Sequence, residues 1–179
     1  MSILERKILP SHLFKHYVEG RTKAYAGGGE DVYNPDPNLL GFKVFRWTNP
    51  DLPYHFEDHY TDNPQRPGNF GGFEINRESS EYGGVLSFYD YNGGLTNDGM
   101  RLGEVIIYPR LIRFLGEHVE VVRFGKNVVY TIEDESGNWV YQGIGEIEAY
   151  GWYDEELITN NGLLVYKLRG SGICFIPES

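Results

Sequence analysis

The stretch YHFEDHYTDNPQRPGNFGGFEIN, residues 54–76, decides the fold class. Its two ends, Tyr54–Tyr60 and Phe70–Asn76, are short and rich in aromatic residues, which favour strands because their flat rings pack well on a pleated surface. Between them lies Thr61–Asn69, a segment with two prolines and one glycine, which are typical of loops. We therefore predict two strands joined by a loop.

The same pattern of short aromatic and β-branched runs, separated by Gly- and Asn-rich breaks, continues along the chain. Further strands are predicted at Gly41–Trp47, Gly84–Tyr91, His118–Phe124, Val128–Asp134, Trp139–Ala149 and Leu163–Leu168. Turns are predicted at Asn92–Gly94, Gly125–Asn127, Ser136–Asn138 and Asn160–Gly162.

Two segments have helical features. In Ser11–Glu19 the apolar residues share one face, Ser11 is a suitable N-cap, and Gly20 is a stop signal. The second helix is predicted at Pro109–Leu115, because proline suits the first turn of a helix. An extended or irregular lead-in from Gly103 is expected before it.

A weak internal repeat organises these elements. YHFED (54–58) resembles YTIED (130–134), and GGFEI (71–75) resembles GIGEI (143–147). We predict one domain, 1–179, of the α+β class: a mostly antiparallel sheet with two short helices and pseudo-twofold duplicated halves at about 11–94 and 104–172. The match needs several gaps, so chance resemblance is the alternative for the repeat. A partly closed β-barrel is the alternative fold.

Composition and charge narrow the function classes. The net charge is −10, and no basic stripe is present, so we expect no nucleic-acid partner and no anionic membrane partner. Cys174 is the single cysteine, which leaves no internal disulfide, and its apolar neighbours indicate a buried small side chain. No long apolar run and no signal-peptide core are found, so the cytoplasm is the expected location.

Motifs for cofactors and metals are weak. The glycines Gly27–Gly29 are followed by two acidic residues, which would repel the phosphate that a phosphate loop holds. His55 and His59 are four residues apart on a predicted strand, about 13 Å, which is too far for one zinc ion. His12 and His16 share a helix side but have no nearby carboxylate on that helix. We expect no metal and no cofactor.

Several of these motifs resemble a prokaryotic family that is known only as a domain of unknown function. The resemblance rests on AGGGE (26–30), Tyr60 followed by GGFE (71–74), YDYNG (89–93), and a closing half with GE (145–146), Tyr166 and Gly170. It spans roughly residues 11 to 172. Some members are fused to helix-turn-helix regulators, which implies a sensory or ligand-binding role, and the family assigns no catalytic residue. This chain departs from the family in its Pro-rich loop and in lacking a DNA-binding segment.

A candidate site follows from strand alternation. Neighbouring side chains of a strand point to opposite faces, so Glu74 lies opposite Phe73 and Ile75. If these apolar residues face the core, Glu74 and its repeat partner Glu146 face either water or a cleft in a curved sheet. The predicted ligand-binding residues are Glu74, Tyr89, Tyr91, Glu146 and Trp152. Glu74 would anchor a cationic or hydroxyl-rich ligand, and Glu74→Gln would weaken its binding with little effect on the melting temperature.

The leading functional hypothesis is non-catalytic binding or sensing of a small organic ligand, because aromatic walls with a few polar groups are typical of small-molecule pockets. One alternative is a small hydrolase or isomerase that uses Glu74 and a tyrosine as acid and base. Another is an interaction module that forms a homodimer through an exposed sheet face. The plainest alternative is that the aromatic residues form an ordinary core and that both glutamates are solvated.

Overall fold

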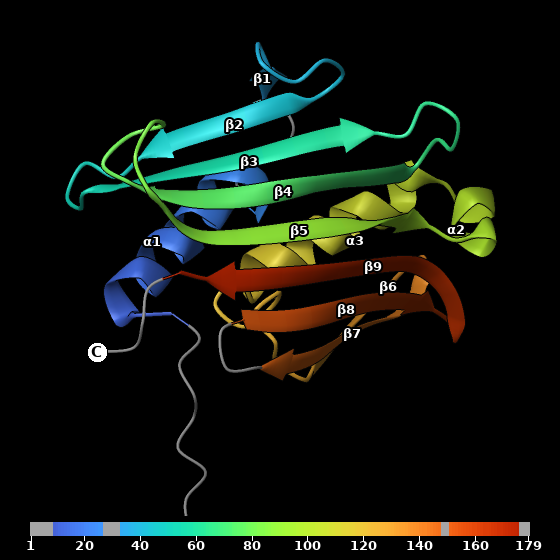
Figure 1. Ribbon diagram of the computed structural model, residues 1–179. Coiled ribbons are helices and arrows are strands. Elements are labelled where there is room, and N and C mark those ends of the chain that lie inside the picture. Colours follow the sequence, from blue (N-terminus) through green and yellow to red (C-terminus); the bar gives the residue numbers. More distant parts are fainter. Residues whose placement is uncertain (1–8, 27–32, 148–150, 176–179) are drawn as a thin grey trace, which may run out of the picture.

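A computed structural model describes residues 9–26, 33–147 and 151–175. In these segments the chain forms one nine-stranded antiparallel sheet, and helices cover one of its faces (Figure 1). We call the helix-covered face the inner face and the opposite one the outer face. The strands are β1 (Asn34–Pro35), β2 (Lys43–Thr48), β3 (Tyr54–Asp62), β4 (Asn69–Glu78), β5 (Val85–Leu95), β6 (Val128–Asp134), β7 (Gly137–Ile147), β8 (Gly151–Asn160) and β9 (Leu163–Cys174).

The strand order is β1-β2-β3-β4-β5-β9-β8-β7-β6. Two meanders, β2–β5 and β6–β9, therefore meet at the central pair β5·β9. Strands β1 and β6 are the two edges, and within the described segments they do not pair with each other, so the sheet is open. The prediction of a mostly antiparallel α+β fold is confirmed, and the partly closed barrel is wrong.

Three α-helices are present in the part of the chain that the structure covers, rather than the two predicted. They are α1 (Ser11–Arg21), α2 (Asn97–Leu102) and α3 (Glu104–Glu117), and a π-helical turn, η1 (Thr22–Ala26), extends α1. The helix α1 continues through Gly20, which was predicted to end it. A Cβ at Gly20 would lie 2.5 Å from the ring of Phe56, so this glycine lets α1 pack closely on β3. The N-cap is Pro10, without a side-chain hydrogen bond, so the predicted Ser11 cap is wrong.

The second half differs from prediction in three places. The helix α3 starts at Glu104, so the extended lead-in is wrong, and Pro109 lies inside the helix on an exposed position. The predicted strand His118–Phe124 is a turn segment, whose Val122 and Phe124 pack into the core. Strand β8 was not predicted, because its acidic residues hide the apolar alternation.

The predictions for the glycine-rich segments have different outcomes. The predicted turn at Asn92–Gly94 is instead part of β5. The predicted turn at Asn160–Gly162 is confirmed, with Asn161 at φ 48° and Gly162 at φ 81° between β8 and β9. The glycines Gly27–Gly29 lie outside the described residues.

The hydrophobic core lies between the inner face and the helices. It contains the fully buried rings of Tyr17, Phe56, Phe114, Trp139, Tyr141 and Tyr166. Cys174 is buried at the end of β9. No helix of the described residues is both long and apolar enough to cross a membrane.

Candidate functional site

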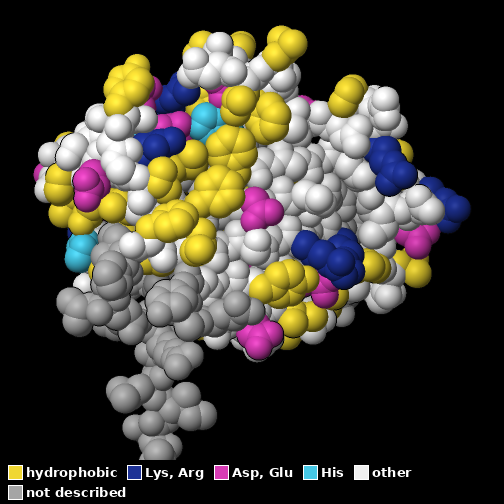
Figure 2. Space-filling model, viewed as in Figure 1, with side chains coloured by type: hydrophobic (Ala, Val, Ile, Leu, Met, Phe, Trp, Pro, Cys, Tyr) yellow, Lys and Arg dark blue, Asp and Glu magenta, His cyan; other side chains and the backbone are white. Residues whose placement is uncertain are grey.

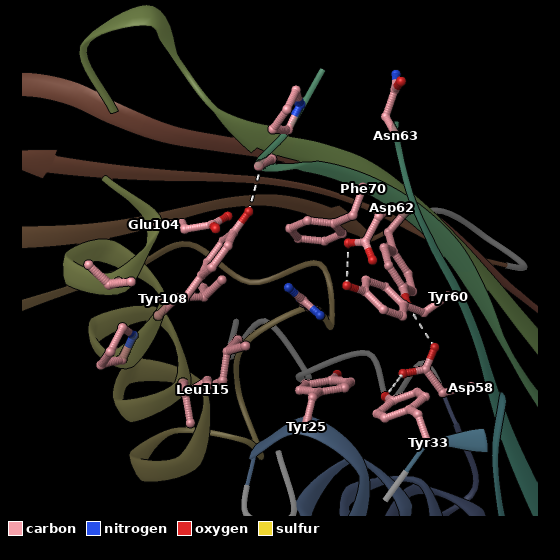
Figure 3. A pocket seen from close by; sticks show the side chains of 18 of the residues that line it. Tyr25, Tyr33, Asp58, Tyr60, Asp62, Asn63, Phe70, Glu104, Tyr108 and Leu115 are labelled. Carbon is pink, nitrogen blue, oxygen red and sulfur yellow. Dashed lines mark hydrogen bonds between the residues drawn. The ribbon is translucent and has the colours of Figure 1, made fainter. Parts of the chain in front are cut away.

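A cavity of about 690 Å³ lies between the inner face of β3–β5 and helix α3. Figure 3 shows Glu104, Tyr108 and Leu115 of α3 on one side and Tyr60 and Asp58 on the other. The lining residues are Tyr25, Tyr33, Asp58, Tyr60, Asp62, Asn63, Pro64, Pro67, Gly68, Phe70, Tyr91, Glu104, Val105, Tyr108, Pro109, Leu111, Ile112, Leu115 and Arg123. Six of these are aromatic, and this size and lining are typical of small-molecule sites.

Strand alternation and two glycines shape the cavity floor. A row of paired residues crosses the sheet from Tyr60 through Gly72, Tyr91 and Gly170 to Asp154. A Cβ at Gly72 would lie 2.6 Å from the hydroxyl of Tyr91, and one at Gly170 would lie 2.2 Å from the hydroxyl of Tyr89. Large side chains therefore lean over glycines, which leaves room for Tyr91 to reach Asp58.

Asp58 is the acidic group in the cavity wall. It is 1% exposed, Tyr91 donates a hydrogen bond of 2.7 Å to its Oδ1, and Tyr33 donates one to its Oδ2. Glu74 lies directly opposite on β4. Burial raises the pKa of Asp58 to about 7 and the charge of Glu74 adds to the rise, whereas the two tyrosine hydrogen bonds oppose it. Asp58 can therefore gain or lose a proton near neutral pH.

Glu74 is held by a buried ion pair. The Nε and Nη2 atoms of Arg21 both lie 2.9 Å from its Oε2, and Tyr25 donates a 3.0 Å hydrogen bond to its Oε1. Both charged side chains are fully buried. Arg21 also donates through Nη1 to the backbone carbonyls of Val122 and Arg123, at 3.3 and 3.1 Å. The pair thus ties α1 to the segment that follows α3.

A second buried pair stands beside the cavity. Arg123 donates from Nε and Nη2 to the two carboxylate oxygens of Glu156, at 2.8 and 3.0 Å, and Tyr141 adds a 2.8 Å hydrogen bond. The Arg123 guanidinium carbon lies 5.0 Å from the ring centre of Tyr25 and 5.6 Å from that of Tyr91. Arg123 therefore reaches the cavity with its charge already matched by a carboxylate.

Asp154 is a second buried acid with a shifted pKa. Its Oδ1 accepts a 2.8 Å hydrogen bond from the backbone N–H of Gly125. Burial raises its pKa to about 7, and that hydrogen bond opposes the rise. Unlike Asp58, Asp154 does not line the cavity. The two aspartates form a natural comparison between a buried acid at the cavity and one away from it.

Of the predicted site residues, Tyr91 lines the cavity. Tyr89 and Trp152 lie on the same inner face but stack on each other, with ring centres 5.9 Å apart, and do not line it. Glu74 points toward the helices rather than toward an open cleft, because Arg21 neutralises it there. Glu146 is exposed near the end of β7 and does not line the cavity either.

The outer face carries a smaller polar cluster beside an aromatic stack. His59 lies 2.6 Å from Asp36 and 2.7 Å from Glu57, and its ring stacks on Phe73 at 4.5 Å. Figure 2 shows a band of hydrophobic side chains crossing this face over β2–β5. Across residues 9–26, 33–147 and 151–175, no three His, Cys, Asp or Glu side chains are grouped so that they could hold a metal ion.

The sequence pattern does not single out Asp58 as a site residue. Asp58 stands out only as the last residue of the repeated motif YHFED, and nothing local in the sequence shows that Tyr33 and Tyr91 contact it. Comparison of the chain with protein-family models, curated proteins and solved structures gives no match in any of the three.

Proposed function

We propose that this domain binds a small organic ligand, without catalysis, in the cavity beside Asp58. The observation that carries the proposal is the combination of a roughly 690 Å³ space, six aromatic rings and one buried carboxyl group in its wall. An apolar enclosure with few polar groups binds through apolar burial and is oriented by those groups.

The test uses N-phenyl-1-naphthylamine, a neutral dye whose fluorescence rises in apolar surroundings. We expect saturable binding of one dye per chain. Val105 and Ile112 both line the cavity, two turns apart on α3, and both are exposed, at 79% and 40%. The double variant Val105→Trp/Ile112→Trp should therefore fill the cavity from its rim without disturbing the core, and should abolish binding.

Val129→Trp is the matched control, because Val129 is 63% exposed on β6 and does not line the cavity. This variant should bind the dye as the wild type does. Equal dye binding by the cavity-filled variant and the wild type would refute the proposal. A metabolite library screened by thermal shift would then identify candidate ligands, because a ligand that binds only the native state raises its stability.

An acid–base enzyme is the second candidate, and the pKa of Asp58, raised to about 7 by burial, favours it. The Glu/Tyr pair expected from sequence has a structural counterpart in Glu74 and Tyr25, but Glu74 does not line the cavity. Asp58 with the hydroxyl of Tyr33 is therefore the better pair for proton transfer. Turnover of a bound ligand that is lost in Asp58→Asn would favour this candidate over simple binding.

A homodimer is the third candidate, and the aromatic stack of Phe73 and Phe88 on the outer face favours it, with ring centres 5.7 Å apart. Analytical ultracentrifugation of wild type and Phe73→Ser/Phe88→Ser decides this point. If the wild type is a monomer at all concentrations, the dimer hypothesis is refuted.

We also propose that the two halves are a duplication, as the internal repeat of the sequence predicts. Each half has a helix followed by a four-strand meander, and each supplies one buried Arg–Glu pair, Arg21–Glu74 and Arg123–Glu156. Superposition of residues 54–94 and 130–172 in an experimental structure is the test. The cytoplasm stays the proposed location, on the single cysteine of the sequence.

A further inference from the structure

The charge around the cavity is unbalanced. Among the described residues, Asp58 has no Lys, Arg or His within ion-pair distance, whereas Arg123, the cation that lines the cavity, is bound by both oxygens of Glu156. The lining also contains Asp62 and Glu104, which are exposed at the rim. Asp62 has Lys43 at 3.5 Å, in an exposed pair that water screens. Three carboxyl groups and one neutralised arginine therefore line the space.

The aromatic rings of the cavity also favour a cation. A ring carries negative potential on its face, so cations are attracted to it. Arg123 already uses Tyr25 and Tyr91 in this way. Tyr33 and Phe70 extend the aromatic lining of the cavity. The net charge of −10 adds a field that draws cations toward the molecule.

We propose that the ligand of this cavity is an organic cation: a protonated or quaternary amine on an apolar body, with its charge held at Asp58. This inference rests on the proposed function, since it names the class of ligand for the same site. The apolar body would lie against Phe70, Leu111 and Leu115, which are apolar side chains of the cavity lining. The amine supplies the positive charge that Asp58 lacks.

Other ligand classes fit the same wall less well. An anion would meet three carboxyl groups, and the charge of Arg123 is already matched by Glu156. A sugar needs many hydrogen-bonding partners, but much of the lining consists of Phe70, Pro and aliphatic side chains. A cation with an apolar body uses both the acid and the rings.

The experiment compares two probes of the same shape. Benzyltrimethylammonium carries a permanent charge, and 2,2-dimethylpropylbenzene has carbon in place of its nitrogen. Their affinities are measured by displacement of N-phenyl-1-naphthylamine at about pH 8. We expect the wild type to bind the cation at least about tenfold more tightly, because a desolvated cation gains from both the rings and the carboxylate.

Two matched variants test whether the preference for the cation depends on Asp58. Asp58→Asn should weaken binding of the cation by about tenfold or more and leave the hydrocarbon within about twofold, because only the charged partner is lost. Asp154→Asn removes a buried acid that does not line the cavity, so the preference for the cation should remain.

The affinity for the quaternary cation should also depend on pH. The groups that face Asp58 are Tyr25 from η1, Glu74 from β4, Tyr91 from β5, and Tyr33 and Arg123 from the loops. Arg21 of α1 is the ion-pair partner of Glu74. Burial raises the pKa of each of these tyrosines, so they stay neutral, and the arginines and Glu74 are paired. The ionised fraction of Asp58, with a pKa of about 7, then rises about tenfold from about pH 6 to about pH 8, and affinity follows it.

The outcomes separate the inference from the proposed function. If the hydrocarbon displaces the dye as well as the cation does, or if Asp58→Asn keeps the cation preference, the inference is overturned and the cavity remains a binding site. If neither probe displaces a dye that the cavity-filled variant fails to bind, the inference is again overturned. If the cavity-filled variant binds the dye as the wild type does, the proposed function itself fails.

Discussion

Replacing Asp58 by asparagine should stabilise the protein at alkaline pH while it removes the charge from the cavity wall. Asparagine has nearly the same shape, and its amide can keep a hydrogen bond with each of Tyr33 and Tyr91 if one hydroxyl reverses. The wild-type carboxyl has a pKa of about 7 in the folded protein against a model value of 3.8. The folded state therefore binds this proton more tightly, and stability falls as the pH rises between these two values.

The magnitude follows from the two pKa values. Integrated from about pH 5 to about pH 8, this one group lowers the free energy of unfolding of the wild type by about 2–3 kcal/mol. Asp58→Asn does not titrate there. Its advantage over the wild type in unfolding free energy should therefore grow by that amount across the interval, and should stay constant above pH 8.

Urea unfolding followed by tryptophan fluorescence at both pH values measures the difference. Asp154→Asn should behave similarly, because burial raises the pKa of Asp154 to about 7 as well. If the stability difference between Asp58→Asn and wild type is the same at both pH values, the reasoning about the buried acid is refuted.

Three further predictions concern the surrounding structure. His16 is fully buried against Trp47, and burial lowers its pKa to about 4. The wild type should therefore lose up to about 3 kcal/mol of unfolding free energy as the pH falls from about 6.5 through about 4. His16→Phe should abolish this loss, which urea titrations at about pH 6.5 and about pH 4 measure. Glu74→Gln should lower the free energy of unfolding by about 3–5 kcal/mol, since it leaves the buried Arg21 without its counter-charge, and an unchanged melting temperature would contradict the ion-pair account. Gly72→Ala places a Cβ 2.1 Å from the carbonyl oxygen of His59 and 2.6 Å from the hydroxyl of Tyr91, so it should destabilise the protein and reduce dye binding. Gly71→Ala is the control on the same strand, because a Cβ there would meet its nearest atom at 3.4 Å, an ordinary contact distance.

The strands of the first half could be predicted because their aromatic runs alternate clearly and end at Pro- and Gly-rich loops. Strand β8 could not, because Asp154 and Glu156 occupy inner positions where a strand pattern requires apolar residues. The charges are tolerated there only because Arg123 and the backbone of Gly125 meet them. Those partners come from a turn segment that is distant in sequence, so no local pattern shows them.

The predicted orientation of Glu74 is wrong for the same reason, because the partner of this buried charge also lies far away in the sequence. The rule that apolar residues face the core placed Phe73 and Ile75 inward, but Phe73 lies on the outer face, stacked between His59 and Phe88. The inner face accepts Glu74 because Arg21 arrives from α1, 53 residues earlier in the chain. Aromatic side chains and an acidic side chain do line the cavity, but the buried acid in its wall is Asp58 and not Glu74. Only the packing of β3, β4 and β5 brings Tyr33 and Tyr91 to it.

A crystal structure of the wild type grown with N-phenyl-1-naphthylamine tests the central claim most directly. The account predicts that the dye occupies the cavity between α3 and the inner face, with its rings against Phe70 and Leu111 and within reach of Asp58. A dye bound instead on the outer face over Phe73 and Phe88, with the cavity closed by its own side chains, would contradict it.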